Sequence, residues 1–276
     1  MPEDANQSVL RFEDVSLAFD ETPVLSGISF DMLAGETRVV LGAAGSGKTV
    51  LLKAALGLLR ANSGRIYVFG QDVTAMGERE WAELRSRMGM LFQEGGLFDS
   101  LTIEENVSYP LLNQGQLRCP LDQVRPRVEE ALKFVELEHT LDKFPSELSG
   151  GMRRRVGIAR AVVTEPPLVL YDSPTAGLDP ITAYTIMALI IKGRDQKNVA
   201  SVIVTHRYQD GQLVANYRYN PDSGRLETAA SEGRPNGQGT KFMVLREGRL
   251  VFEGTEEQLE ASRDEYVSKF VNRSDE

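Results

Sequence analysis

The chain has 276 residues and a formal net charge of −9, and its hydrophobic content of 41% is ordinary for a globular protein with a sizeable core. The acidic balance argues against broad nucleic-acid binding, and the single cysteine, Cys119, excludes an internal disulfide framework and a cysteine-based metal site. No apolar run approaches about 18 residues and the polar N-terminus is unlike a secretory signal, so we expect a cytoplasmic protein.

The first third of the chain alternates between strand and helix patterns. Residues 1–8 are polar and predict a frayed tail. Apolar residues at helical spacing predict a helix after residue 49 and another over 78–88, in which Trp81 belongs to the core. Alternating or β-branched apolar residues predict strands over 9–19, 24–31, 37–41, 65–69 and 88–92.

The pattern changes after residue 93. Residues 94–145 are rich in helix formers, which predicts a helical insertion into an α/β core. A further helix opens at Ser149. Short apolar runs at 168–171 and 200–205 predict buried strands, with a helix over 183–192 between them. Strands alternating with helices predict a doubly wound, mainly parallel sheet that binds phosphates at the carboxyl ends of its strands.

The last quarter of the chain is less regular. Candidate strands at 213–219 and 225–229 flank a turn, and the Gly-, Pro-, Asn- and Gln-rich stretch 231–240 predicts a mobile loop. A hairpin over 242–252 and one polar helix then close the chain.

A phosphate-binding loop lies between the strand at 37–41 and the helix that follows it. Its residues fit the pattern G-x-x-x-x-G-K-[ST] and are Gly42, Ala43, Ala44, Gly45, Ser46, Gly47, Lys48 and Thr49. Glycines allow the backbone N–H groups to approach phosphates closely, and the helix N-terminus favours anions. We expect Lys48 to reach the β- and γ-phosphates and the Thr49 hydroxyl to hold Mg²⁺.

Two other strand ends carry polar residues. Asp172 closes an apolar strand, where a carboxylate suits a direct or water-mediated Mg²⁺ contact opposite Thr49. The alternative is that Asp172 only caps the junction between strand and turn. His206 ends the strand at 200–205, so both side chains are expected at the same edge of the sheet as the phosphate loop.

A second candidate anion site opens the helix at 149. Ser149, Gly150 and Gly151 place a hydroxyl and two glycines at a helix start, although Ser149 could equally be an ordinary N-cap. One nucleotide does not need two such sites, whereas two chains that share nucleotides head-to-tail do.

With these motifs in order, the sequence resembles the nucleotide-binding subunit of an ABC transporter over about 9–209 and 241–260. The resemblance identifies 42–49 as Walker A, Gln93 as the Q-loop, 148–152 as the signature, 168–172 as Walker B, 176–179 as the D-loop with Asp179, His206 as the switch histidine and Phe19 as the aromatic that stacks on adenine. It implies that Thr49, Gln93 and Asp172 surround Mg²⁺, and that two subunits close on two ATP molecules and two Mg²⁺ ions.

The resemblance also implies partners and an organisation. The second ATPase chain is a copy or a paralogue, and a permease docks in the groove beside Gln93, which places the chain on the cytoplasmic face of the inner membrane. The implied fold is a RecA-like P-loop core with an antiparallel β-subdomain and an inserted helical subdomain. The predicted units are a tail (1–8), the first part of the core with the β-subdomain (9–93), the helical subdomain (94–164), the second part of the core (165–209), an inserted hairpin and loop (210–240) and the C-terminal hairpin and helix (241–276).

A finer resemblance concerns two stretches, 91–102 and 147–156, which are similar to the Mla/Mce-associated ATPases. That group implies phospholipid transport at the bacterial envelope and a periplasmic Mce-type lipid-binding component. The run Arg153 to Arg155 could touch lipid headgroups, although a solvated helix face is the simpler interpretation.

One position departs from the family. The family usually carries Glu after the Walker B aspartate, where this chain has Ser173. An alcohol can orient water but cannot take its proton as a carboxylate does. Three hypotheses follow: a transport ATPase that replaces the Glu by other groups, an ATP-gated switch with little hydrolysis, or an ABC protein acting on nucleic acid, which the acidic charge and single cassette disfavour.

The insertion at 210–240 is a second departure from the family. It is either a tolerated surface hairpin and loop or, as a sharper hypothesis, a docking element whose Tyr217 and Tyr219 face a partner subunit.

Overall fold

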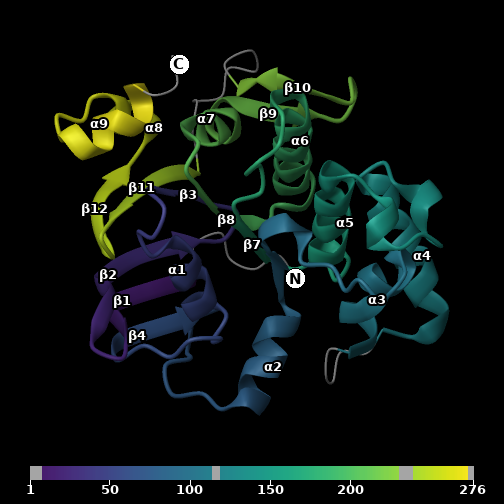
Figure 1. Ribbon diagram of the computed structural model, residues 1–276, viewed down its shortest axis with the longest axis horizontal. Helices are drawn as coiled ribbons and strands as arrows, with labels where there is room; N and C mark the ends of the chain where they lie inside the picture. Colours follow the sequence, from purple (N-terminus) through teal and green to yellow (C-terminus); the bar gives the residue numbers. More distant parts are fainter. Residues whose placement is uncertain (1–7, 114–118, 230–238, 273–276) are drawn as a thin grey trace.

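The computed structural model describes residues 8–113, 119–229 and 239–272, and its main element is a six-stranded sheet of order β12-β11-β3-β8-β7-β6 (Figure 1). Neighbours from β11 to β6 pair in parallel, and only β12 is antiparallel. The strands are β3 (Thr37–Gly42), β6 (Met88–Leu91), β7 (Leu168–Asp172), β8 (Ala200–Thr205), β11 (Thr240–Arg246) and β12 (Arg249–Gly254). The predicted mainly parallel sheet is thus confirmed. The tail and the loop predicted at 231–240 lie almost wholly outside the described residues.

A second sheet is antiparallel and packs beside the first, as the resemblance implied. Its order is β2-β1-β4-β5. One continuous hydrophobic cluster joins it to the six-stranded sheet and to helix α1 (Lys48–Ala55), so the two sheets share a core. Its strands are β1 (Ser8–Phe19), β2 (Thr22–Leu33), β4 (Ser63–Val68) and β5 (Gln71–Asp72).

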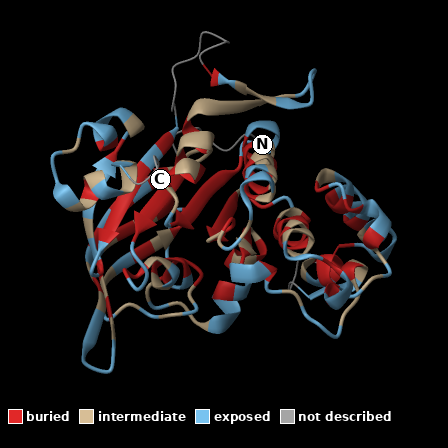
Figure 2. Ribbon diagram, turned by 45° about the horizontal axis from the view of Figure 1, so that its top comes forward, coloured by how far each residue is buried: buried red, intermediate tan, exposed pale blue. Residues whose placement is uncertain are grey.

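The side chains of strand β7 point alternately into the two hydrophobic cores on either face of the sheet. Leu168 and Leu170 point into the core shared with the antiparallel sheet, whereas Val169 and Tyr171 point into a second core formed with helices. Successive side chains of a strand face opposite sides, so a strand covered on both faces is apolar throughout. Buried residues accordingly fill the central strands in Figure 2.

Helices cover the sheet and form the predicted helical insertion. At one side of the molecule, α3 (Ile103–Asn113) and α4 (Leu121–Phe134) pack with α5 (Gly150–Val162) (Figure 1). The other helices are α2 (Glu78–Ser86), α6 (Pro180–Lys197), α7 (Tyr208–Asn216), α8 (Glu256–Glu260) and α9 (Glu265–Asn272), with 3-10 turns η1 (Gln93–Gly95), η3 (Glu138–Thr140) and η4 (Pro145–Glu147). No helix in the described ranges is both long and apolar enough to cross a bilayer. The boundaries of the predicted units remain predictions.

Two predictions about the last quarter of the chain are wrong. Residues 213–216 continue α7 instead of forming a strand, and the hairpin consists of β9 (Tyr217–Asn220) and β10 (Arg225–Thr228). The apolar residues of this stretch, among them Val214 and Ala215, are buried against two different hydrophobic clusters from one helix. Gly211 allows the close packing of that helix, since a Cβ there would lie only 2.4 Å from the ring of Phe242. The C-terminus holds two helices, since Thr255 caps α8 and Asp264 accepts hydrogen bonds from the first turn of α9.

Candidate functional site

The phosphate-binding loop connects the end of β3 to the start of α1. Gly47 precedes the helix with φ 102°, no side chain caps the helix and its first turn carries no acidic residue. Its N-terminal N–H groups therefore remain available to an anion. At Gly42 a Cβ would lie 2.4 Å from Ser46 Oγ and 2.7 Å from the carbonyl oxygen of Leu245, so only glycine fits there.

Lys48 folds back over the loop. Its Nζ donates to the carbonyl oxygens of Gly42, at 2.7 Å, and Ala43, at 2.8 Å. Burial lowers the pKa of Lys48, and the carboxylate of Asp172 opposes that shift. The loop therefore carries a positive charge directed to the region in which phosphates are expected.

A cavity of about 410 Å³ collects most of the predicted catalytic residues. It gathers side chains from the phosphate loop, from η1 and from the ends of β7 and β8, which the parallel sheet brings to one edge. Its lining residues are Val24, Ala44, Gly45, Ser46, Gly47, Lys48, Thr49, Val50, Gln93, Ser173, Ala176 and His206.

Asp172 and Ser173 form a hydrogen-bonded pair at the end of β7. Asp172 is buried, and Ser173 Oγ donates to its Oδ1 at 3.2 Å. The backbone N–H of Ser173 donates to Val204 at 2.9 Å, and its φ of 50° lies in the left-handed region. The hydroxyl is thus held at the cavity wall, where it can orient a water molecule but cannot act as a general base.

The oxygen atoms present fit Mg²⁺ bound together with a nucleotide. The Thr49 hydroxyl, the Gln93 amide and the Asp172 carboxylate supply the hard donors that Mg²⁺ prefers. Among the described residues no group of three or more His, Cys, Asp or Glu forms a metal cage of its own. This donor set suits an ion that takes its remaining ligands from phosphates and water.

Other predicted residues lie outside this cavity. Phe19 is 45% exposed at the turn between β1 and β2 and does not line it. Ser149 caps α5 by accepting from the N–H of Met152 at 3.2 Å, and Gly150 and Gly151 follow it in that helix. One chain therefore does not bring the signature residues to its own phosphate loop.

Asp179 acts as a helix cap. It accepts from the N–H groups of Ile181, at 3.1 Å, and Thr182, at 3.0 Å, at the start of α6. Hydrogen bonding from Thr182 lowers the pKa of Asp179. The structure accounts for this carboxylate without a nucleotide.

Sequence reasoning missed Asp210, which joins the loops after β7 and β8. Its Oδ2 accepts from Oγ1 of Thr175, at 2.6 Å, and of Thr205, at 2.7 Å. Burial raises the pKa of Asp210. The available signal was a carboxylate one helical turn after His206, but nothing in the sequence showed its partners.

Sequence reasoning also missed Arg160 of α5 and misinterpreted Arg154 of the same helix. Arg160 is buried, and its Nη2 donates to the carbonyl oxygens of Gly95, at 3.1 Å, and Gly96, at 2.8 Å, just after the predicted Q-loop. Arg154 is also buried and donates to the carbonyl of Ala176. Neither a solvated face nor a lipid contact describes Arg154, because its guanidinium connects α5 to the loop after Ser173.

Comparisons with known proteins show the family of the chain. A family model described as ABC transporter matches residues 25–176. The chain is 36% identical over 223 residues to the methionine import ATP-binding protein MetN of Mesorhizobium japonicum, covering 81% of this chain but only 60% of MetN. It is 31% identical over 266 residues to the intermembrane phospholipid transport system ATP-binding protein MlaF of Haemophilus influenzae, covering 96% of this chain and 91% of MlaF.

A solved structure extends the agreement to the whole fold. The dimeric post-hydrolysis state of the ATP-binding cassette MJ0796, bound to ADP and Pi, matches with a TM-score of 0.73 and 26% identity, covering 89% of this chain and 98% of that one. The predicted fold, enzyme class and cofactors are those of this family. The chain belongs to the ABC transporter family and is one of its ATP-binding chains, which are ATPases that bind ATP with Mg²⁺.

Proposed function

We propose that this chain hydrolyses ATP to drive a membrane permease, working as a pair with a second copy or a paralogue. The observation that carries this proposal is the incomplete site: Lys48, Gln93 and His206 line one cavity, while Ser149 and Gly151 lie outside it. A second chain supplies the missing anion-binding helix start. The dimeric form of MJ0796 supports such a pair. The permease docks beside Gln93 at the cytoplasmic face of the inner membrane.

The proposed cargo is phospholipid. The similarity to MlaF spans nearly the whole of both chains, whereas MetN extends well beyond the part that this chain matches. A periplasmic Mce-type component belongs to the same proposal. Methionine import is the second candidate, because the identity to MetN is somewhat higher over the shared region.

The residues of the cavity have separate tasks in this proposal. Bound Mg²⁺ neutralises phosphate charge, and Thr49, Gln93 and Asp172 are the residues that would hold it. Lys48 and the N–H groups of α1 bind phosphate oxygens. Since Ser173 cannot accept a proton, water must be activated by positioning and charge alone or by another acceptor. Loss of a general base costs roughly 10²–10⁴-fold in rate, so turnover is slow unless another acceptor replaces the missing carboxylate.

The specific alternative is an ATP-gated switch, which Ser173 itself favours. In that case ATP binding closes the pair, and release of nucleotide, more than hydrolysis, reopens it.

Steady-state ATPase activity of the chain with its permease separates the two functions. We expect the wild type to exceed Lys48→Ala clearly and Ser173→Glu to change the rate little, if other groups activate water. A wild-type rate equal to that of Lys48→Ala, with brisk hydrolysis by Ser173→Glu and intact ATP binding, identifies the switch.

The cargo is tested in the same complex. We expect phosphatidylglycerol vesicles to change the ATPase rate and methionine to leave it unchanged. The reverse result would replace phospholipid transport by methionine import.

A further inference from the structure

A second cavity of about 400 Å³ opens between α5, α6 and the β9–β10 hairpin. It shares no lining residue with the nucleotide cavity. Its volume is in the range of small-molecule sites, roughly 300–1,000 Å³. The inserted hairpin, which departs from the family pattern, supplies one wall of it.

Cationic side chains from three elements line this cavity. Arg155 comes from α5, Lys192 from α6 and Arg225 from β10, and Glu136 is the single carboxylate among the lining residues. Three cations against one anion leave a local excess of two positive charges in a chain whose net charge is −9. In the described part of the chain, none of the three cations forms an ion pair with a carboxylate. Arg155 donates to the carbonyl oxygen of Val135 at 3.2 Å and Lys192 to that of Phe134 at 3.4 Å, so these groups have hydrogen bonds but no carboxylate to balance their charge. Such cations in a concave site attract an anion.

The cavity also offers apolar and aromatic surface. Leu189 is buried in its floor, and Leu226 of the hairpin packs against the same core cluster. Lys192 Nζ lies 5.6 Å from the ring centroid of Tyr219, which lines the cavity, and 4.5 Å from that of Phe134 outside it, so both rings are within cation–π distance of the ammonium. An occupant that combines an anionic group with an apolar group matches both parts of the lining.

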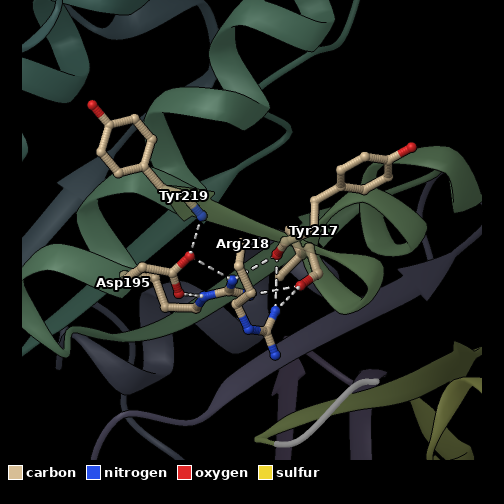
Figure 3. Close-up of polar contacts among 6 residues, drawn as sticks. Asp195, Tyr217, Arg218 and Tyr219 are labelled. Carbon is tan, nitrogen blue, oxygen red and sulfur yellow. Dashed lines mark hydrogen bonds and ion pairs between the residues drawn. The ribbon is translucent and has the colours of Figure 1, made fainter. Parts of the chain in front are cut away.

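The hairpin wall is held in place by an ion pair on α6 between the buried Arg194 and Asp195, whose side chain is 18% exposed (Figure 3). Arg194 donates to both carboxylate oxygens of Asp195, at 2.7 and 3.0 Å, and to the carbonyl of Tyr217 at 2.9 Å. The same carboxylate accepts from the backbone N–H of Tyr219 at 2.8 Å. The wall is thus preformed, which reduces the entropy that binding would cost.

Figure 3 shows the rings of Tyr217 and Tyr219 pointing in different directions from this anchor. Tyr219 lines the cavity, and Tyr217 packs against the core cluster. These intrachain contacts weigh against the hypothesis that both tyrosines face a partner subunit.

We propose that this cavity binds a small anionic molecule, a phosphate monoester or a carboxylate joined to an apolar group, with the anion among Arg155, Lys192 and Arg225. The proposal goes beyond the transport function and does not depend on it. Arg155 lies on the helix that starts at Ser149, and Lys192 lies on the helix that Asp179 caps. The occupant therefore bridges the helical insertion and the core.

Calorimetric titration of octyl phosphate, below its micellar concentration, tests this site in the full chain. Mg²⁺ and a non-hydrolysable ATP analogue are kept saturating, so that the phosphate loop is already filled. We expect one site per chain and an affinity at least tenfold tighter than that of inorganic phosphate or octanol. Absence of saturable binding overturns the proposal, and equal affinity for inorganic phosphate overturns its apolar part.

Charge reversals locate the binding. Arg225→Glu and Lys192→Glu should each weaken octyl phosphate binding tenfold or more. Arg79→Glu makes the same charge change at an exposed arginine of α2 and should have no effect. Arg225 is exposed on the hairpin, so its variant should keep the wild-type circular dichroism spectrum. Unchanged binding in Arg225→Glu, or equal weakening by Arg79→Glu, contradicts the assignment.

Discussion

The phenolic oxygen of Tyr266 lies 3.2 Å from the backbone nitrogen of Ala43, although the two residues are 223 positions apart. The same hydroxyl donates to the carbonyl oxygen of Leu245 at 3.2 Å. Helix α9 therefore anchors the start of the phosphate-binding loop to strand β11, and the C-terminal segment becomes part of the support of the nucleotide site.

Tyr266→Phe tests this anchor, because it removes the hydroxyl and keeps the ring. We expect the free energy of unfolding to fall by about 0.5–1.5 kcal/mol, the usual net value of a hydrogen bond. Affinity for a non-hydrolysable ATP analogue should fall several-fold as the loop loses its support. Denaturant unfolding and calorimetry measure the two effects. Tyr109→Phe, at an exposed tyrosine of α3, is the control, and equal behaviour of the two variants would disprove the anchor.

Gly42→Ala should impair nucleotide binding more than folding. The added Cβ would meet Ser46 Oγ at 2.4 Å and the Leu245 carbonyl at 2.7 Å, so the loop itself must shift. We expect a loss of affinity for the ATP analogue of at least tenfold by calorimetry. Gly70→Ala is the control, since its Cβ enters open space at a positive φ of 77°. Its cost should be limited to backbone strain of about 1 kcal/mol, without loss of affinity.

Arg160→Ala should destabilise the loop after Gln93. It leaves the carbonyls of Gly95 and Gly96 without their buried donor, which costs about 2–3 kcal/mol in the free energy of unfolding. Arg160→Lys should recover little, because an ammonium cannot reproduce the planar guanidinium. Urea unfolding measures both variants. Arg127→Ala, at an exposed arginine of α4, should lie within about 0.5 kcal/mol of the wild type, and a similar loss there would refute the specific role.

Asp210→Asn should change how stability depends on pH. Burial raises the pKa of Asp210 in the folded state above its unfolded value. Between the two values the folded state keeps a proton that the unfolded state has lost, so wild-type stability falls as pH rises through that window. Asparagine does not ionise. The free energy of unfolding of the variant, relative to that of the wild type, should therefore rise with pH and level off above the raised pKa. Urea unfolding at a series of pH values measures the difference.

Asp264→Asn should change the pH dependence of stability in the opposite direction. The N–H groups of Val267 and Tyr266 lower the pKa of Asp264. Its contribution to stability is complete above the unfolded pKa and is lost as pH falls through the folded value. The wild type should therefore lose stability relative to Asp264→Asn as pH decreases, and slopes of the same sign in both pairs would contradict these assignments.

Local patterns were sufficient for the nucleotide loop and for the class of the fold. The residues from Gly42 to Thr49 lie between a buried strand and a helix, and each requirement of that motif is met within a dozen residues. The apolar runs that end at Asp172 and His206 likewise placed both residues at the edge of a parallel sheet. Patterns of this kind are readable because backbone geometry and strand periodicity depend on near neighbours in the sequence.

Only the tertiary structure decided which distant groups meet. Three features join elements that are distant in the sequence and share no periodic pattern. They are the contact of Tyr266 with Ala43, the hydrogen bonds of Asp210 and the cavity that Arg225 lines. Residues 213–216 were misread for the same reason, since Val214 and Ala215 of α7 are buried in two different hydrophobic clusters that the local composition does not reveal. Such contacts follow from how sheets and helices stack to bury apolar surface, which is a property of the whole chain and not of any short segment.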